Sequence, residues 1–454
     1  MFRKISVSLL MFALIALAAA CGGAKSAQPA MANTPVGNAI SITSPSAFTD
    51  QFNSYHVVGA ILNNGSSALT AIELAVEIKD ASGNSLLKDD SGVTIPRQVF
   101  APMRETLAPG EGSPFDFSYD ISNGTPASFS VSVAGYESGQ TDRAVLKGEN
   151  FQLVDDTKGT LYLSGKLINT GTQWARLRSV AGFVVGNGDD PLAPPLAAGS
   201  SFAFATMLAP AGDVEGRDQT PFVIAIPNPK LGRDWSKAWR IVLDADQAPA
   251  PVDNPTAVNF TNSYFDQEGA YHIVGYLTNN STVVLNPQLV AGLYAEDGTV
   301  MDASGKFYPV AVDPGKTLPF DLSYFESINS NSAEAARVRT FTVQVDPART
   351  ITPSAATVVL EAVGEQVQKD GSNWTFSGTV TNTSDESLAG VTVTVAVNDG
   401  QNNLVATNST YALPSTKTIS PDETVSYKVI VSLDPTVDPK DFLTVTSVIG
   451  DLAK

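Results

Sequence analysis

Large apolar residues alternate with other residues over nine positions in four separate stretches of this chain. The first stretch runs from Tyr55 to Asn63, with a glycine at its centre and an asparagine at its end, and later copies begin at Leu161, Tyr271 and Trp374. A period of two residues is that of a half-buried β-strand, whereas an amphipathic helix repeats every ~3.6 residues. Each stretch therefore predicts one strand, which we call the signature strand.

The central glycines of the four copies repeat at a nearly constant interval. They are Gly59, Gly165, Gly275 and Gly378, which stand 106, 110 and 103 residues apart. This period is too long for a solenoid repeat and matches a small domain of about 100 residues. Because glycine gives up packing in a strand, we expect a bulky side chain from the facing sheet, such as an aromatic ring, to cover each one.

Each signature strand is expected to end at its asparagine. These residues are Asn63, Asn169, Asn279 and Asn382, and each is followed by Asn-Gly, Thr-Gly, Asn-Ser or Thr-Ser. Such residues favour turns, because they bond their own backbone or accept positive φ angles.

Further alternation surrounds the signature strand in each copy. In the first copy, Ile72–Ile78 leads into an Asp80–Gly83 turn, a Pro109-Gly110 turn leads into Pro114–Phe117, and Phe129–Val133 follows. These patterns predict strands joined by tight turns, about seven in each copy. The predicted fold class is all-β.

The combination of signature strand, asparagine turn, hairpin turn and Pro-Gly turn before a Phe-containing strand resembles the FxLYD family of bacterial extracytoplasmic domains. That family is immunoglobulin-like and recurs in tandem on cell-envelope lipoproteins. The resemblance implies four tandem immunoglobulin-like β-sandwich domains, and it carries over no catalytic residue or cofactor. Copies one and three fit best. Copy two departs most, because residues 186–190 replace the hairpin turn and Pro194-Pro195 interrupts the next strand.

The four sandwiches are expected at residues 39–140, 141–246, 257–350 and 351–454. Copies one and three share Tyr-His-x-Val-Gly, which indicates duplication of a two-domain half. Between the halves, residues 247–256 are rich in proline and predict an extended, semi-rigid linker. We therefore expect a hinge in the middle of the array.

Residues 1–20 predict a cleaved signal peptide. Arg3 and Lys4 precede an apolar run too short for a bilayer span, and small residues precede Cys21. This end resembles a bacterial lipobox, which implies that Cys21 carries several acyl chains and anchors the protein to a membrane. The alternative is an ordinary secretion signal with an incidental cysteine. Residues 21–38 are rich in Gly, Ala, Ser and Pro, so they predict a flexible tether.

The net charge of the chain disfavours some classes of binding partner. The chain has 454 residues and a net charge of −18, and loss of Arg3 and Lys4 with the signal peptide changes this to −20. Nucleic acid is disfavoured as a partner, because its binding relies on cationic contacts with phosphates. We interpret the acidity as a source of solubility. A bacterial cell-envelope location outside the cytoplasm is expected.

No catalytic or metal-binding constellation is evident. His56 and His272 occupy the same place in copies one and three, on the strand face opposite Val57, and are expected at the surface. No third histidine and no nearby cysteine complete a zinc site or a catalytic triad. Paired aspartates such as Asp89-Asp90 lack the spacing of a calcium loop, so we interpret them as solvated turns and leave calcium as the alternative. We predict no enzyme activity, no cofactor and no metal.

The sequence thus predicts a membrane-anchored, non-catalytic spacer or adhesin-like binding module. A ligand-capturing or accessory subunit of a cell-envelope complex is the alternative. One local binding hypothesis arises in copy two, which holds three of the four tryptophans and a cluster of cations. Trp239 aligns with Phe129 and is expected in the core. Trp235 is expected to be partly exposed and, with Arg233, to contact an acidic partner, a carbohydrate or a neighbouring domain. For the protein as a whole, an envelope protein or a carbohydrate is the expected ligand.

Overall fold

The computed structural model describes residues 39–452, except 157, 187–192, 202, 213–215, 230–234, 236–237, 253–254, 308–310, 347–356, 413–417 and 438–441. The signal peptide, Cys21, the whole tether and Arg233 therefore lie outside the described residues. Within the described ranges, no helix is long and apolar enough to cross a membrane.

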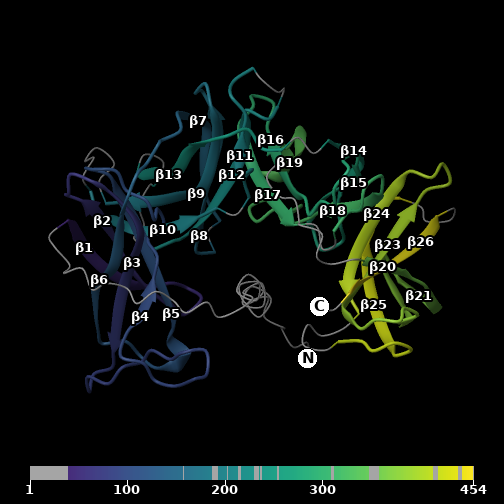
Figure 1. The fold of residues 1–454 in the computed structure, drawn as a ribbon, viewed down its shortest axis with the longest axis horizontal. Helices are drawn as coiled ribbons and strands as arrows, with labels where there is room; N and C mark the ends of the chain where they lie inside the picture. Colours follow the sequence, from purple (N-terminus) through teal and green to yellow (C-terminus); the bar gives the residue numbers. More distant parts are fainter. Residues whose placement is uncertain are drawn as a thin grey trace. The chain divides into compact units, whose positions relative to one another are not determined.

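The described chain is all-β, as predicted, and its sheets form β-sandwiches. Its sheets are antiparallel, and none closes into a barrel (Figure 1). The only helical turns among the described residues are two short 3₁₀ segments, Ile121–Asn123 and Ala335–Arg337. The sheets follow one another along the chain as four consecutive pairs.

Among the described residues, each pair combines a three-stranded sheet with a sheet of three or four strands. The first pair consists of β1 (Ile40–Thr49), β2 (Ser54–Asn63) and β5 (Gly112–Asp120) in one sheet, and β4 (Gln98–Phe100), β3 (Ala68–Lys79) and β6 (Ser128–Gly139) in the other. The second consists of β12 (Gln219–Pro227), β8 (Thr160–Asn169) and β7 (Leu146–Asp155), and of β9 (Trp174–Val185) paired with β10 (Pro195–Ser200), β11 (Met207–Leu208) and β13 (Trp239–Ala248). The third consists of β14 (Thr256–Phe265), β15 (Tyr271–Asn279) and β18 (Thr317–Leu322), and of β17 (Val300–Phe307), β16 (Gln288–Tyr294) and β19 (Thr340–Asp346). The fourth consists of β21 (Ala362–Asp370), β22 (Asn373–Thr381) and β25 (Thr424–Ser432), and of β20 (Thr357–Leu360), β26 (Leu443–Leu452), β23 (Leu388–Asn398) and β24 (Leu404–Tyr411).

All four predicted signature strands are confirmed as β2, β8, β15 and β22. Each is the central strand of a three-stranded sheet, which we call the signature sheet of its pair; the other sheet is the companion sheet. Alternate residues of the signature strand enter the core, as the two-residue period requires. In the first pair, Val57 and Ile61 are at most 1% exposed and pack with Leu74 and Phe115. Each such side chain contributes roughly 1.5–3 kcal/mol to stability by leaving water.

The outer face of each of the first three signature sheets is also covered. Strand β10 lies against β2 and β5, β17 lies against β8 and β12, and β24 lies against β14, β15 and β18. These three strands occupy the same place in their companion sheets. The companion sheet of one pair thus packs on the signature sheet of the pair before it, and the same contact is made three times.

The predicted hinge at residues 247–256 is wrong in this structure. The sheet pairs before and after that linker are held together by buried contacts. The Ser164 hydroxyl, on a residue only 2% exposed, donates to the Val300 carbonyl at 2.6 Å. Val290 of β16 belongs to the apolar cluster of the second pair. A proline-rich segment sets its own local stiffness, but it does not determine whether the elements on either side pack together.

Candidate functional site

The signature glycines make room for aromatic rings, as predicted, but the rings come from a different place. A Cβ atom on Gly59 would lie 2.6 Å from Cζ of Phe115, and one on Gly378 would lie 2.9 Å from the Tyr427 ring. Phe115 and Tyr427 are the cross-strand partners of these glycines within the signature sheet. The same holds for Gly165 with Phe222 and for Gly275 with Phe320. The expectation that the ring belongs to the facing sheet is therefore wrong.

The signature asparagines are buried, and their side chains form hydrogen bonds to neighbouring segments in addition to favouring turns. Asn63 is fully buried, its Nδ2 donates to the carbonyls of Ser67 and Leu107 at 2.9 and 3.0 Å, and its Oδ1 accepts from the Gly65 amide. Asn382 makes equivalent bonds to the Glu386 and Ile419 carbonyls. Asn169 and Asn279 repeat the pattern. Each asparagine thus ties the end of its strand to the segment before the next strand of its signature sheet.

The two histidines are buried, so their predicted surface position is wrong. His56 is 6% exposed; its Nδ1 lies 2.9 Å from Asp116, and its Nε2 lies 3.4 Å from Asp50. The Phe48 ring stacks on the imidazole with ring centroids 4.9 Å apart. Phe48 in turn packs against the apolar cluster of the second sheet pair. The cluster therefore lies beneath the contact between the first two pairs.

The third sheet pair carries the same arrangement. His272 is 7% exposed; its Nδ1 lies 2.9 Å from Asp321, and its Nε2 lies 3.2 Å from Asp266. Tyr264 stacks on it with ring centroids 4.9 Å apart. The Tyr264 hydroxyl donates to the Ser432 carbonyl of the fourth pair at 2.8 Å. Both histidine clusters thus support an aromatic ring that touches the following pair.

The surroundings of these imidazoles favour their protonated form. Both ring nitrogens of each histidine face carboxylate oxygens, which only accept hydrogen bonds, so both nitrogens must donate. Burial lowers the pKa of His56, but the hydrogen bond and charge of Asp116, together with Asp50, outweigh it and raise the pKa above its usual value. The pKa of His272 is raised in the same way by Asp321 and Asp266. Each pair of aspartates therefore favours the imidazolium form of its buried histidine, and burial at the same time raises the pKa of Asp116.

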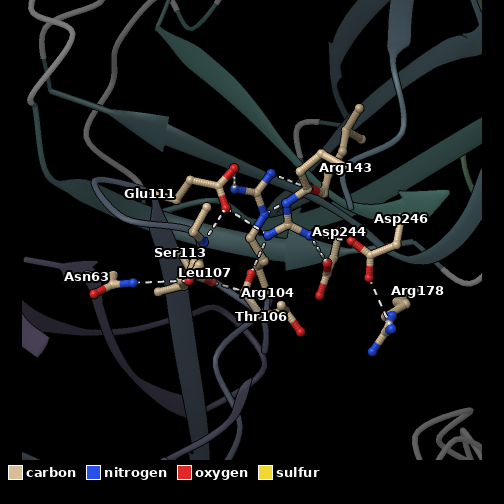
Figure 2. A network of polar contacts seen from close by, with 12 residues as sticks. Asn63, Arg104, Thr106, Leu107, Glu111, Ser113, Arg143, Arg178, Asp244 and Asp246 are labelled. Atoms are coloured by element: carbon tan, nitrogen blue, oxygen red, sulfur yellow. Dashed lines mark hydrogen bonds and ion pairs between the residues drawn. The ribbon is translucent and has the colours of Figure 1, made fainter. Parts of the chain in front are cut away.

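A network of arginines and carboxylates joins the first and second sheet pairs (Figure 2). Arg143 lies between β6 and β7 and contacts both pairs: Glu111 at 2.7 Å in the first, and Asp244 and Asp246 at 2.8 and 3.2 Å in the second. Arg104 of the first pair donates from Nε to the Leu243 carbonyl at 2.8 Å. Burial lowers the pKa of Arg143, but its carboxylate partners raise it overall. The segment between the pairs is thus pinned to both of them.

Polar contacts also join the second pair to the third, beyond the Ser164 bond. The Thr206 amide and hydroxyl both donate to Oδ2 of Asp346, at 2.7 and 2.6 Å. Asp346 is only 2% exposed.

Asp302 of β17 is fully buried and accepts from the backbone amides of Ala303, Ser327 and Ile328, all within the third pair. Burial raises the pKa of this carboxyl to about 7.

The two outermost sheet faces of the described chain are exposed and carry mostly polar residues, although Val99, Val363 and Ile430 are also exposed there. On the companion sheet of the first pair, Ser128, Ser130 and Ser132 of β6 are exposed. On the signature sheet of the fourth pair, Ser426 and Lys428 of β25 are exposed. The equivalent faces inside the array are buried; every residue of β16 from Gln288 to Leu293, for example, is buried. Exposed, mostly polar outer faces at both ends terminate a stack of sheets, as capping repeats do.

The binding hypothesis for Trp235 and Arg233 is not supported. Trp235 is 5% exposed and belongs to the apolar cluster of the second pair, so its predicted exposure is wrong. A bulky apolar indole in a turn region is driven inward wherever the turn reaches the core. Arg233 lies outside the described residues. Trp239 packs on the same cluster, as predicted, with its ring 5.2 Å from that of Phe151.

Sequence reasoning missed the polar clusters between the pairs, although one signal was present. Copies one and three combine a histidine in the signature strand with an aspartate after Pro-Phe, at Asp116 and Asp321. Copies two and four have Val223 and Lys428 in that place and no histidine. This joint occurrence pairs His56 with Asp116. Within the described part of the chain, no group of three or more His, Cys, Asp and Glu side chains is arranged to hold a metal ion.

No protein-family model and no curated protein matches this sequence. Among solved structures, the chain is similar to red sea bream transglutaminase, with 13% identity over 42% of this chain and 30% of that one and a TM-score of 0.15. It is also similar to the native conformation of E. coli alpha-2-macroglobulin, with 11% identity over 89% of this chain and 28% of that one and a TM-score of 0.12. This chain therefore spans less than a third of either structure. Similarity at these TM-scores supports no conclusion about activity.

Proposed function

We propose that this protein is a lipid-anchored, extracytoplasmic spacer of the bacterial cell envelope, built from four tandem immunoglobulin-like domains of the FxLYD type and without catalytic activity. Cys21 is the anchor, and the tether of residues 21–38 joins it to the sandwiches. The four sheet pairs hold a binding surface or a partner at a fixed distance from the end of the tether.

The observation that carries this proposal is the repeated face-to-face contact between consecutive sheet pairs. A string of independent domains on flexible linkers leaves its sheet faces polar and solvated. In this chain three signature sheets bury their outer faces under the next pair, and buried polar groups such as Ser164, Asp346 and Asp244 bond across the contacts or lie at them. Pairing of buried polar groups fixes one relative arrangement, because any other leaves them unsatisfied. Such coupling favours a spacer over a set of separately mobile binding modules.

Two measurements test the two halves of the proposal. For the anchor, the Cys21→Ser variant should move from the detergent phase to the aqueous phase in detergent partitioning and keep its fold by circular dichroism. Retention in the detergent phase would exclude the lipid anchor. For the spacer, calorimetry of the Cys21→Ser chain should show strongly coupled unfolding of the sheet pairs. Four separate transitions that do not respond to substitutions in neighbouring pairs would contradict a rigid spacer.

A further inference from the structure

The last strand of the third sheet pair, β19, has an outer edge that pairs with no strand among the described residues. β6 of the first pair shares this feature, because it pairs only with β3, whereas the last strands of the second and fourth pairs are covered. Strand β26 is paired on both sides, by β23 and by the four residues of β20. On β13, the Gln247 amide donates to the Asp142 carbonyl, and the Ala144 amide donates to the Ala245 carbonyl, so the preceding segment covers that edge. Strand β19 pairs only with β16 among the strands that the structure describes.

The sequence before the third pair explains the difference. Residues 247–256 contain Pro249, Pro251 and Pro255. Proline has no amide hydrogen, so this segment is a poor candidate for an added strand. From Thr256 onward the chain pairs with β15 in the signature sheet. It therefore does not cross to β19 in the way that β20 crosses to β26.

A cleft of about 350 Å³ lies along the free edge of β19. Thr342 and Gln344, on one face of the strand, line it, and so do Val343 and Val345 on the other face. A cleft lined by both faces of one strand exposes the edge of that strand. Val258 of β14 adds to the apolar side of the cleft. Edge backbone amides and carbonyls beside apolar side chains form a template for strand addition.

The opposite wall of the cleft comes from the second sheet pair and carries a cation. Arg217, Gln219 and Pro221 line this wall. The Arg217 side chain is partly buried, and it makes no hydrogen bond or ion pair with any residue that the structure describes. A guanidinium in this position favours an acidic group on whatever occupies the cleft.

We propose that the free edge of β19 binds an extended peptide as an added antiparallel strand, with apolar side chains toward Val343 and Val345 and an acidic residue facing Arg217. Strand β20 shows the chemistry of such an occupant within the same chain. Its Leu360 is 4% exposed, whereas the adjacent Val359 is 81% exposed, so alternate apolar residues seat the strand. Main-chain hydrogen bonds supply affinity in this mode of recognition, and alternate side chains supply specificity. The spacer thereby acquires a peptide-binding site at the contact between its two halves.

The test uses the Cys21→Ser chain and a labelled peptide with the sequence of residues 355–361, Ala-Ala-Thr-Val-Val-Leu-Glu. Fluorescence anisotropy should show saturable binding, and hydrogen exchange should show new protection of the β19 amides. Thr342→Trp fills the cleft and should weaken binding by about tenfold or more, which corresponds to about 1.4 kcal/mol. Thr340→Trp is the matched control, because Thr340 lies on the same strand and is exposed but does not line the cleft. It should leave affinity within about a factor of two.

A second pair of measurements tests the role of the cation. Arg217→Gln should weaken binding of the glutamate peptide by about three- to tenfold and should not change binding of the same peptide with glutamine at its end. The peptide with Val359→Pro should not bind, because proline cannot continue the ladder.

Several results would overturn the proposal. These are the absence of saturable binding up to about 1 mM peptide, equal effects of Thr342→Trp and Thr340→Trp, and equal binding of the proline peptide. Slow exchange of the β19 edge amides in the free protein would show that the chain itself covers this edge, and would also overturn it. The inference goes beyond the spacer function, and its failure leaves the anchoring and coupling tests unaffected.

Discussion

Replacement of Arg143 by alanine tests the contact between the first two sheet pairs most directly. The guanidinium donates from Nη2 to the Thr106 carbonyl and to Glu111, at 2.6 and 2.7 Å, and from Nη1 to Asp244 at 2.8 Å. Asp244 has a side chain only 2% exposed, so the substitution leaves a buried carboxylate without its cation. Breaking a buried ion pair on one side costs about 3–5 kcal/mol. The Arg143 and Glu111 side chains are 22% and 28% exposed, so water screens part of their electrostatic interaction. We therefore expect the free energy of unfolding to fall by about 2–4 kcal/mol.

The assay is equilibrium urea unfolding of the Cys21→Ser chain, followed by tryptophan fluorescence. This signal reports mainly on the second sheet pair, because three of the four tryptophans, Trp174, Trp235 and Trp239, lie there and the fourth, Trp374, lies in β22. The matched control is Arg178→Ala: Arg178 is 53% exposed and makes a 3.0 Å ion pair with Asp246 at the margin of the same network. An exposed pair of this kind is worth about 0.2–1 kcal/mol. If the two alanine variants lose the same stability, Arg143 is an ordinary surface arginine and the contact between the pairs does not depend on it.

Three further predictions concern the signature residues and the histidine clusters. Gly275→Ala should lower the stability by about 1–3 kcal/mol, because its Cβ would lie 2.4 Å from the Asn259 carbonyl oxygen and 2.6 Å from Cα of Phe260, both backbone atoms. Calorimetry should show a larger loss of stability for this variant than for Gly378→Ala, whose Cβ would lie closest to the Tyr427 side chain. Asn382→Ala should lower the stability by about 1–3 kcal/mol in the same assay, because it leaves buried carbonyls without hydrogen-bond donors. A negligible loss of stability would show that Asn382 only favours the turn. For His56 and His272, burial lowers the pKa, but their aspartate partners raise it above the ordinary 6.5 in the folded state. The stabilisation by these histidines is therefore fully present below about pH 6.5 and is lost as the pH rises through the higher folded-state pKa. Unfolding curves from about pH 5.5 to 9 should show this fall in the free energy of unfolding. A variant with both histidines replaced by glutamine should show a weaker dependence of stability on pH.

The sequence alone determined the strands and the chemistry of their ends. Alternation of apolar residues is a local property of one strand, so Tyr55–Asn63 and its three copies could be assigned without knowledge of their neighbours. The need of Gly59 for a bulky neighbour followed from the same pattern. The strand that supplies this neighbour could not be predicted, because both the next strand of the same sheet and the opposite sheet carry aromatic residues. Only the strand register places Phe115 beside Gly59.

Tertiary structure alone decided what lies on the outer face of each signature sheet. His56 points away from the core of its own pair, so the pattern of its strand predicted a surface residue. It is buried because Asp116, sixty positions away along the chain, and Phe48 enclose it beneath strands of the next pair. Trp235 is likewise buried by residues remote in sequence. The periodicity of one strand specifies which of its faces is apolar, whereas the covering of its other face depends on sheets about one repeat further along, whose packing no local pattern encodes.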